Sequence, residues 1–325
     1  MTTSGLGAAV SADRVSIALL DAAVGSQGLP AAQRWTATHD GVIAAPDAPT
    51  GVHSATTLGV LADHAPAAEI ISIAVTPGDD VVRIVRALEW LRRRRVDIVC
   101  VPVALVACNV VLAPLLADLR GAGTLVVGAV GNGGEGHVCQ PALDPNVFAV
   151  GACREDGAPL SFSGSMVDRE RRIREPGVLD RGELGTSVAC ARVAGRAAAL
   201  LDRHRHVRAV DVGWALAETA APMPDHVRHR SRRGPVDFDA ADQLLASGMR
   251  GPGGVAPVPT PDGPPWIDPR LRWHLGSAHP DRAISAVLLS HGTEVVSLRP
   301  AELEAALQDP GLVAASAGDL AIWTL

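Results

Sequence analysis

Residues 185–195 read Gly-Thr-Ser-Val-Ala-Cys-Ala-Arg-Val-Ala-Gly, and no other stretch of the chain narrows the fold as far. Small residues continue beyond it, which predicts an Ala-rich helix over residues 187–201. Ser187 then stands at the N-terminus of this helix, where free backbone N–H groups and the helix dipole favour negative charge. Such a place lowers the cost of forming an alkoxide, so Ser187 is a candidate nucleophile. Taken alone, Gly-Thr-Ser is by default only a helix cap.

Val- and Ile-rich runs alternate with amphipathic stretches along most of the chain. Buried strands are predicted at residues 15–20, 69–75, 96–103, 124–129 and 148–152. Besides the Ala-rich helix, apolar residues at helical spacing predict helices over residues 81–91, 112–120 and 210–221. This alternation predicts an α/β fold, with helices on both faces of a mostly parallel sheet.

The Gly- and Pro-rich stretch at residues 251–265 marks a domain boundary, because it can continue neither a helix nor a strand. We divide the chain into an N-terminal segment (1–11), a main domain (12–248), a linker (249–265) and a small C-terminal β/α module (266–325). In this module we expect strands at 283–289, 294–298 and 320–325 and a short helix at 300–307. No motif in the module indicates its role.

Composition excludes several classes of protein. The net charge of −6 weighs against nucleic acid as a partner, and we expect the basic runs at residues 92–95 and 226–233 to be solvated faces. Residues 1–12 lack the basic start and apolar run of a signal peptide, and no uncharged apolar stretch reaches membrane-spanning length. We therefore expect a cytoplasmic protein without a membrane partner.

The cysteines and acidic residues predict neither disulfides nor a metal site. Five cysteines, an odd number without close pairing, are expected to be reduced and mostly buried; they are Cys100, Cys108, Cys139, Cys153 and Cys190. The sequence contains no cysteine–histidine ligand cluster and no acidic loop with the spacing of a strong calcium site. We expect no metal and no cofactor.

Three further candidate residues stand at the ends of predicted elements. Asp21 directly follows the strand at 15–20, at the carboxyl edge where parallel sheets present functional groups. His53 lies in a turn before a helix, and Asn132 follows the strand at 124–129 within Gly-Asn-Gly-Gly, whose glycines allow close approach. Each alone is more often a cap, a turn former or a surface residue. Together with Ser187 they supply what serine hydrolysis requires: a nucleophile, a base, a carboxylate that orients the base, and an oxyanion donor.

Several blocks resemble those of one family, the subtilases. Residues 185–195 resemble its Gly-Thr-Ser-Met-Ala-Ala-Pro-His-Val-Ala-Gly signature without a gap. Other similar blocks include residues 21–24 (Asp-Thr-Gly-Val in the family), 53–59 (His-Gly-Thr-His-Val-Ala-Gly), 130–134 (Ala-Gly-Asn-Glu-Gly) and 234–237 (Gly-x-Val-Asp). The resemblance covers roughly residues 12–248, and the order Asp, His, Ser is that of subtilisin.

This resemblance implies a subtilisin-like three-layer fold with a central, mostly parallel sheet. It implies a serine endopeptidase that hydrolyses peptide bonds through an acyl-enzyme, acting on a peptide or protein substrate. The implied catalytic triad is Asp21, His53 and Ser187, and the implied oxyanion donor is Asn132.

The substrate-binding edges depart from the family pattern. Residues 100–104, Cys-Val-Pro-Val-Ala, stand where subtilases carry Asn-Met-Ser-Leu-Gly. The resemblance implies a substrate groove lined by Pro102, Val103, Ala104, Ala129, Val130 and Gly131. Pro102 retains a carbonyl for the substrate but has no N–H, and Ala104 adds a methyl group, so we expect a narrower cleft and a restricted substrate. Residues 1–12 are too short for the folding-assisting prodomain of secreted subtilases. We therefore expect an intracellular enzyme, or one that a dedicated partner protein helps to fold.

A second interpretation is a catalytically weak subtilase-like scaffold that binds a peptide or partner protein. Ala22 and Ala23 replace the family's Thr-Gly after the candidate carboxylate, which removes a side-chain hydrogen bond and predicts looser orientation of His53. Retention of all four chemical groups favours the enzyme, because a pure binder gains nothing from keeping them together.

Overall fold

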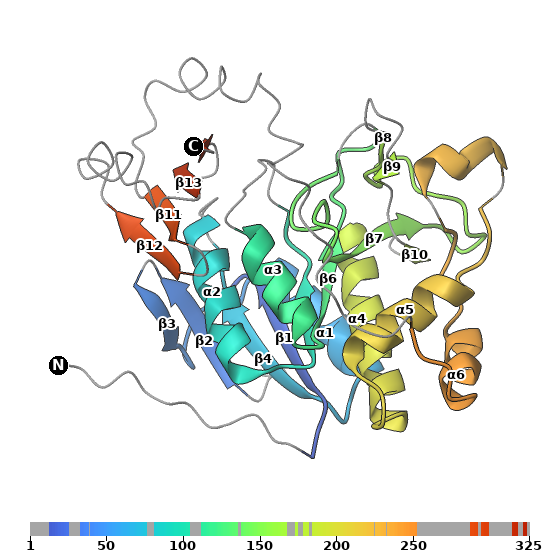
Figure 1. The fold of residues 1–325 in the computed structure, drawn as a ribbon, viewed down its shortest axis with the longest axis horizontal. Coiled ribbons are helices and arrows are strands. Elements are labelled where there is room, and N and C mark those ends of the chain that lie inside the picture. Colours follow the sequence, from blue (N-terminus) through green and yellow to red (C-terminus); the bar gives the residue numbers. More distant parts are fainter. Residues whose placement is uncertain are drawn as a thin grey trace.

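The computed structural model describes residues 13–25, 33–38, 40–76, 81–104, 112–135, 138–167, 173–174, 178–181, 184–223, 225–231, 233–251, 287–291, 294–298, 314–317 and 321–323. Its main feature is an eight-stranded sheet between two layers of helices (Figure 1). The predicted three-layer α/β fold is confirmed.

The sheet has the strand order β10-β7-β6-β5-β1-β4-β2-β3. Its strands are β1 (Ser16–Asp21), β2 (Gln33–Thr38), β3 (Gly41–Ala44), β4 (Glu69–Ala74), β5 (Ile98–Val101), β6 (Leu125–Ala129), β7 (Phe148–Cys153) and β10 (Val178–Arg181). All neighbouring strands are parallel except β2 and β3, which form an antiparallel pair at one edge. The carboxyl ends of the central strands therefore meet at one edge of the sheet.

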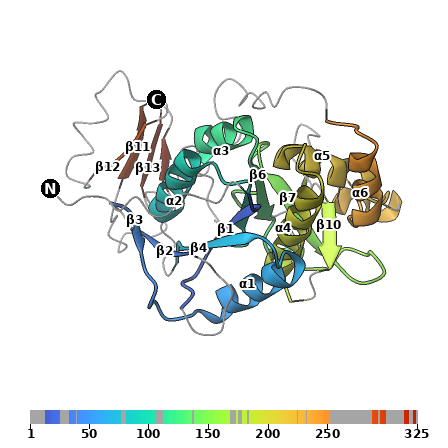
Figure 2. The same ribbon diagram turned by 90° about the horizontal axis from the view of Figure 1, so that it is seen from below.

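Six α-helices lie in the described part of the chain: α1 (Val52–His64), α2 (Val81–Arg94), α3 (Leu112–Gly121), α4 (Thr186–Arg203), α5 (Ala209–Thr219) and α6 (Phe238–Ala246). Helices α2 and α3 cover one face of the sheet, and the other four pack on the opposite side (Figure 2). Strand β1 shows why two layers form, since Ile17 and Leu19 join one core while Ala18 and Leu20 join the other. Alternate residues of a strand point to opposite faces, so a strand with apolar residues on both faces requires cover on both.

The predicted strands and helices of the main domain are confirmed, with small shifts at their ends. Strand β5 is shorter than the predicted 96–103 and ends at Val101. Pro102 follows, and proline has no N–H to continue the ladder. Strands β2, β3 and β10 and helix α6 were not predicted. Helix α6 carries a recognisable start signal, because the Asp237 carboxylate accepts a hydrogen bond from the Ala240 N–H at 2.9 Å.

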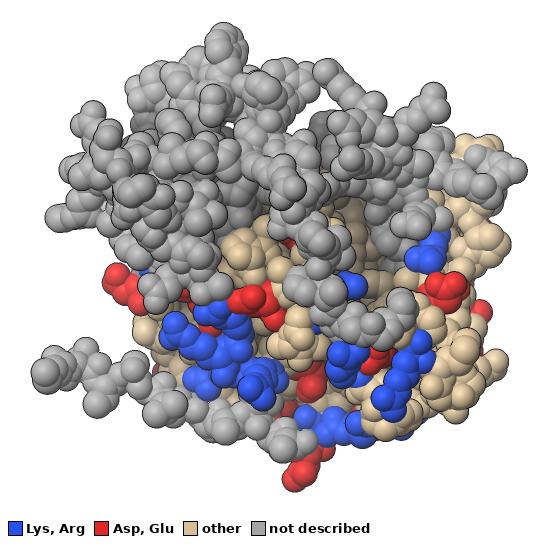
Figure 3. Space-filling model, in the orientation of Figure 1, with Lys and Arg blue, Asp and Glu red and all other residues tan. Residues whose placement is uncertain are grey.

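The basic runs are not simply solvated faces. Arg92 pairs with Asp118 of α3 at 2.6 Å, and the Arg94 guanidinium lies 5.5 Å from the ring centroid of Trp35 on β2. Arg230, in a 3-10 turn at Asp225–Arg230, donates to the carbonyls of Leu160 and Ser163. Figure 3 shows basic and acidic side chains interspersed on the described part of one face. These arginines therefore hold neighbouring segments together.

The C-terminal part contains a four-stranded antiparallel sheet of order β12-β11-β13-β14. Its strands are β11 (Val287–His291), β12 (Glu294–Leu298), β13 (Ala314–Ala317) and β14 (Ala321–Trp323). Strand β12 matches the predicted 294–298, β11 and β14 overlap the other two predicted strands, and β13 was not predicted. The predicted helix at 300–307, most of the linker and residues 1–12 lie outside the described residues.

The described helices include none that is both long and apolar enough to span a membrane. Among the described residues, no cluster of three or more histidine, cysteine, aspartate or glutamate side chains has the arrangement of a metal site.

Candidate active site

The Asp21 carboxylate lies at the carboxyl end of β1 and is almost completely buried, with 1% of its surface exposed. Burying a carboxylate is costly unless hydrogen bonds replace the lost water. Oδ1 accepts from the backbone N–H of Ala22 at 2.7 Å, and Oδ2 accepts from the Thr57 hydroxyl at 2.6 Å. The His53 ring nitrogen Nδ1 lies 2.8 Å from Oδ1 and 2.9 Å from Oδ2. These contacts fix both oxygens of the carboxylate.

His53 is the second residue of α1, which begins over the end of β1. Gly51 allows this approach, because a Cβ atom there would lie only 2.9 Å from the Cβ of Ala22. Since Nδ1 faces Asp21, Nε2 is the ring nitrogen that remains for another partner. The hydrogen bond to Asp21 raises the pKa of His53, while partial burial acts in the opposite direction.

Thr57 is a residue that the sequence analysis missed. It stands one helical turn after His53 on α1, is 1% exposed, and donates to the carboxylate that His53 also contacts. The family places a hydroxyl directly after the aspartate, where this chain has Ala22. The predicted looser orientation of His53 is therefore not what the structure shows, because Thr57 supplies a hydroxyl from the helix. In the sequence, the spacing of four residues between His53 and Thr57 could have indicated this role, since residues i and i+4 share one helix face.

Ser187 is the second residue of α4 and faces the same edge of the sheet. Its hydroxyl donates to the carbonyl of Pro102 at 2.7 Å. No hydrogen bond joins the described side chains of Ser187 and His53. The preceding Gly185 has φ +136°, a conformation that side-chain-bearing residues rarely adopt.

Asn132 is held by the start of α4. Its Oδ1 accepts from the backbone N–H and from the hydroxyl of Thr186, both at 3.0 Å. These two bonds identify the oxygen end of the amide, so the Nδ2 group remains as a donor. Nearby Gly185 again matters, because a Cβ at this position would lie 3.3 Å from Asn132 Nδ2.

A cleft of about 320 Å³ connects these groups. Its lining contains all four candidate catalytic residues, together with Pro102, Val103, Ala104, Ala129 and Gly131 from the predicted groove, and also Ala22, Thr76 and Thr186. Val130 does not line it, because its side chain is buried with Val138, Ala142 and Ala149. The Val130 N–H donates to Val150, and its carbonyl accepts from Cys139, so neither group is free for a substrate.

The cleft thus brings together the Ser187 hydroxyl, which can rotate, the His53 imidazole, which a buried carboxylate holds, and the Asn132 amide donor. These are the groups that acyl transfer requires. A model of the subtilase family matches residues 41–240, which is more than half of the chain and includes His53, Asn132 and Ser187.

The chain belongs to the subtilase family.

Two curated subtilases are similar to this chain in sequence, and a solved structure is similar to it in fold. Subtilisin Savinase of Lederbergia lenta is 28% identical over 53% of this chain and 70% of its own length. Subtilisin DY of Bacillus licheniformis is 28% identical over 62% of this chain and 75% of its own. The patellamide maturation protease PatA has the same fold, with a TM-score of 0.57 and 24% identity over 72% of this chain and 98% of its own. This subtilase is a serine endopeptidase, a hydrolase that acts on peptide or protein substrates.

The Asp21–His53 contact predicts the titration of His53. In the folded protein, the imidazole NMR signals of His53 should titrate with a midpoint above about 6.5, the ordinary value. Because the folded-state pKa is raised, the stability that the pair contributes is present below pH 6.5 and is lost as the pH rises through that midpoint. Replacing Asp21 with Asn should lower the midpoint, because the negative charge is removed. An unchanged midpoint in Asp21→Asn would show that the carboxylate does not control His53.

Proposed function

We propose that this subtilase hydrolyses peptide bonds through a triad of Asp21, His53 and Ser187. His53 Nε2 takes the Ser187 hydroxyl proton, Ser187 Oγ attacks the scissile carbonyl carbon, and Asp21 stabilises the imidazolium that forms. The imidazolium then gives its proton to the leaving amine, and an acyl-enzyme remains on Ser187. Water activated by His53 hydrolyses this ester and restores the free hydroxyl.

The observation that carries this proposal is the buried Asp21 carboxylate bound to His53 Nδ1 at 2.8 Å, with Ser187 in the same cleft. A carboxylate on Nδ1 selects the tautomer whose Nε2 carries a lone pair, which a general base requires. Asn132 Nδ2 and the backbone N–H of Ser187 then serve as the oxyanion donors. The first turn of α4 supports the second donor, because such N–H groups lack partners within their helix.

The Ser187 hydroxyl must leave Pro102 before it can react. Rotation about the Cα–Cβ bond moves Oγ between staggered positions without moving the backbone. The Pro102 carbonyl is the group expected to accept a substrate N–H, so substrate binding and the hydroxyl compete for one acceptor. A bound substrate would thereby release the Ser187 hydroxyl toward His53.

We also propose a restricted substrate, such as one peptide or one partner protein. Ala104 lines the cleft with a methyl group where the family has glycine, and Pro102 offers only a carbonyl. Both features narrow the set of peptides that can add as a strand at this edge. PatA, which shares the fold, is a maturation protease for patellamide, so a dedicated peptide substrate suits this fold.

A second candidate function is a catalytically weak scaffold that binds a peptide in the same cleft. The Ser187–Pro102 hydrogen bond favours it, since the hydroxyl is held away from the base. Against it stands the Asp21–His53–Thr57 arrangement, whose fixed imidazole would serve no purpose in a binder.

We also propose the domain division given above and a cytoplasmic location for the protein. We propose that residues 266–325 form a small module beyond the linker, because a separate antiparallel sheet lies there. Among the described cysteines, Cys100, Cys139 and Cys190 form no disulfide, which suits the reducing cytoplasm.

Covalent labelling tests the nucleophile. A fluorophosphonate probe should label the wild-type protein and leave Ser187→Ala unlabelled, with both proteins folded by circular dichroism. The Asn132→Ala variant should label more slowly, and kcat should fall by about 10²–10³-fold, the range established for removing one oxyanion donor in subtilisin. Failure of the folded wild type to label would favour the binding scaffold.

Thr57 should act as a positioning residue. Thr57→Val keeps the shape but removes the hydroxyl, and it should lower kcat by about 10- to 150-fold while KM changes little, because a hydrogen bond to a charged group contributes about 1.5–3 kcal/mol. Thr57→Ser should restore most of the activity. The matched control is Thr56→Val, since the exposed Thr56 hydroxyl bonds only to the Val52 carbonyl of its own helix. Equal losses in Thr57→Val and Thr56→Val, or no rescue by serine, would exclude a role through Asp21.

A further inference from the structure

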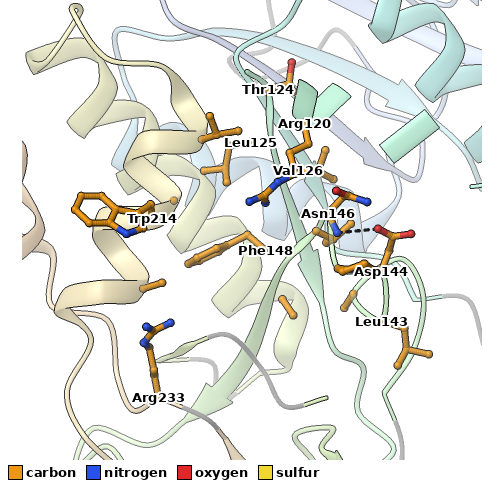
Figure 4. A pocket seen from close by; sticks show the side chains of 17 residues that line it. Arg120, Thr124, Leu125, Val126, Leu143, Asp144, Asn146, Phe148, Trp214 and Arg233 are labelled. Carbon is orange, nitrogen blue, oxygen red and sulfur yellow. Dashed lines mark hydrogen bonds between the residues drawn. The ribbon is translucent and has the colours of Figure 1, made fainter. Parts of the chain in front are cut away.

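A second cavity, of about 530 Å³, lies near the beginning of β6, whereas the catalytic cleft lies beyond the end of that strand. The residues that matter here are Arg120 of α3, Leu125 of β6, Phe148 of β7, Trp214 of α5 and Arg233 (Figure 4). Leu125 and Ala129 line different cavities, and a strand rises about 3.3 Å per residue, so the two cavities are separated by roughly 13 Å along β6. From these groups we propose that the cavity is a ligand site for a carboxylate attached to an aromatic or branched apolar group.

Arg120 is the first observation that points to an anion. Its guanidinium extends into the cavity (Figure 4), and its Nε atom is buried without a hydrogen-bond partner. No salt bridge or side-chain hydrogen bond joins Arg120 to any other described residue. Arg120 as a whole is only partly buried, but a buried N–H without a partner is costly, and an acceptor in the cavity would remove that cost.

Arg233 approaches the cavity from the opposite side (Figure 4). Its described acidic partner is Glu218, whose Oε2 lies 3.4 Å from Arg233 Nη2. Glu218 is 55% exposed, so this pair is weak and leaves the guanidinium able to contact a ligand. Either guanidinium group is suited to a carboxylate, because arginine can donate two parallel hydrogen bonds to it.

Aromatic side chains complete the cavity. Phe148 lies between the two guanidinium groups, and the Trp214 indole stands at the α5 side (Figure 4). Leu125 adds an aliphatic surface. These groups would bury an apolar body, while the arginines bind its charge. The volume is in the range typical of small-molecule sites, about 300–1,000 Å³.

One acidic residue also lines the cavity, and it limits the charge of the ligand. Asp144 is 5% exposed, and its carboxylate accepts from the backbone N–H of Asn146 at 2.8 Å, within its own turn. Counting two arginines against this carboxylate leaves a local charge of at most about +1, and Glu218 beside Arg233 reduces it further. A monoanion balances this charge better than a dianionic phosphate does.

The experiment uses the full-length Ser187→Ala chain and isothermal titration calorimetry. The probe is N-acetyl-L-phenylalanine, and its matched control is N-acetyl-L-phenylalanine amide, which lacks the charge. The acid should bind at least about tenfold more tightly than the amide, because the amide cannot make the charge-assisted arginine–carboxylate contact. Arg120→Gln should weaken binding of the acid at least about tenfold, whereas Arg93→Gln, the same change at an exposed position of α2, should leave it unaltered.

Additional arms identify the source of the carboxylate. The capped peptide acetyl-Gly-Phe-Glu-Gly-amide presents the same chemistry from within a chain, so Arg120-dependent binding of this peptide would assign the site to an acidic segment of a peptide. Arg120-dependent binding of the amino-acid derivative alone would assign it to a free small carboxylate.

Three results would overturn the proposal. The first is that neither N-acetyl-L-phenylalanine nor the capped peptide binds up to about 10 mM, and the second is binding that Arg120→Gln does not weaken. The third is tighter binding of phenyl phosphate, a dianion, than of N-acetyl-L-phenylalanine. Binding in the catalytic cleft would be insensitive to Arg120→Gln and would fall in the second group. Thermal unfolding of Arg120→Gln, without ligand, checks that the variant remains folded.

Discussion

The buried carboxylate of Asp21 links the sheet to the helix that carries the candidate base. A charge at the end of β1 needs donors, and it receives them from the Ala22 backbone, from Thr57 and from His53. Two of these donors belong to α1, so the start of this helix must lie over the strand. Helix α1 in turn packs closely on α4, because a Cβ at Gly195 would lie 2.9 Å from the Leu61 carbonyl oxygen. The position of Ser187 at the beginning of α4 therefore depends on the same contact.

Much of the main domain could be predicted from the sequence. Strands β1, β4, β5, β6 and β7 are buried on both faces and appear as continuous apolar runs. The edge pair β2 and β3 is only partly buried, so it lacks that signal. The four candidate catalytic residues could be proposed from the sequence because each stands at the end of a recognisable strand or at the start of a helix. Val130 was misplaced in the groove, since sequence alone does not show that the strand continues to bond beyond Ala129 and turns this side chain into the core.

Departures from the family pattern are matched by changes elsewhere in the same site. Ala22 removes a hydroxyl beside Asp21, and Thr57 provides one from the helix. Pro102 removes an N–H from the proposed substrate edge, but its carbonyl, which accepts from Ser187, would become available to a peptide once that bond breaks. Such pairs explain why reading each position separately suggested a weakened site. The contacts between positions show a carboxylate with its donors in place, and a second cavity lined by an arginine whose buried Nε has no hydrogen-bond partner.

The most direct measurement is a crystal structure of the protein after reaction with a phosphonate that mimics the tetrahedral intermediate. Phosphorus should be bonded to Ser187 Oγ, with the phosphonyl oxygen about 2.7–3.1 Å from both Asn132 Nδ2 and the Ser187 backbone nitrogen. His53 Nε2 should then face Ser187 Oγ, while Nδ1 keeps its contact with Asp21. Phosphorus on another residue, or a phosphonyl oxygen turned to solvent with His53 out of reach, would contradict the catalytic assignment.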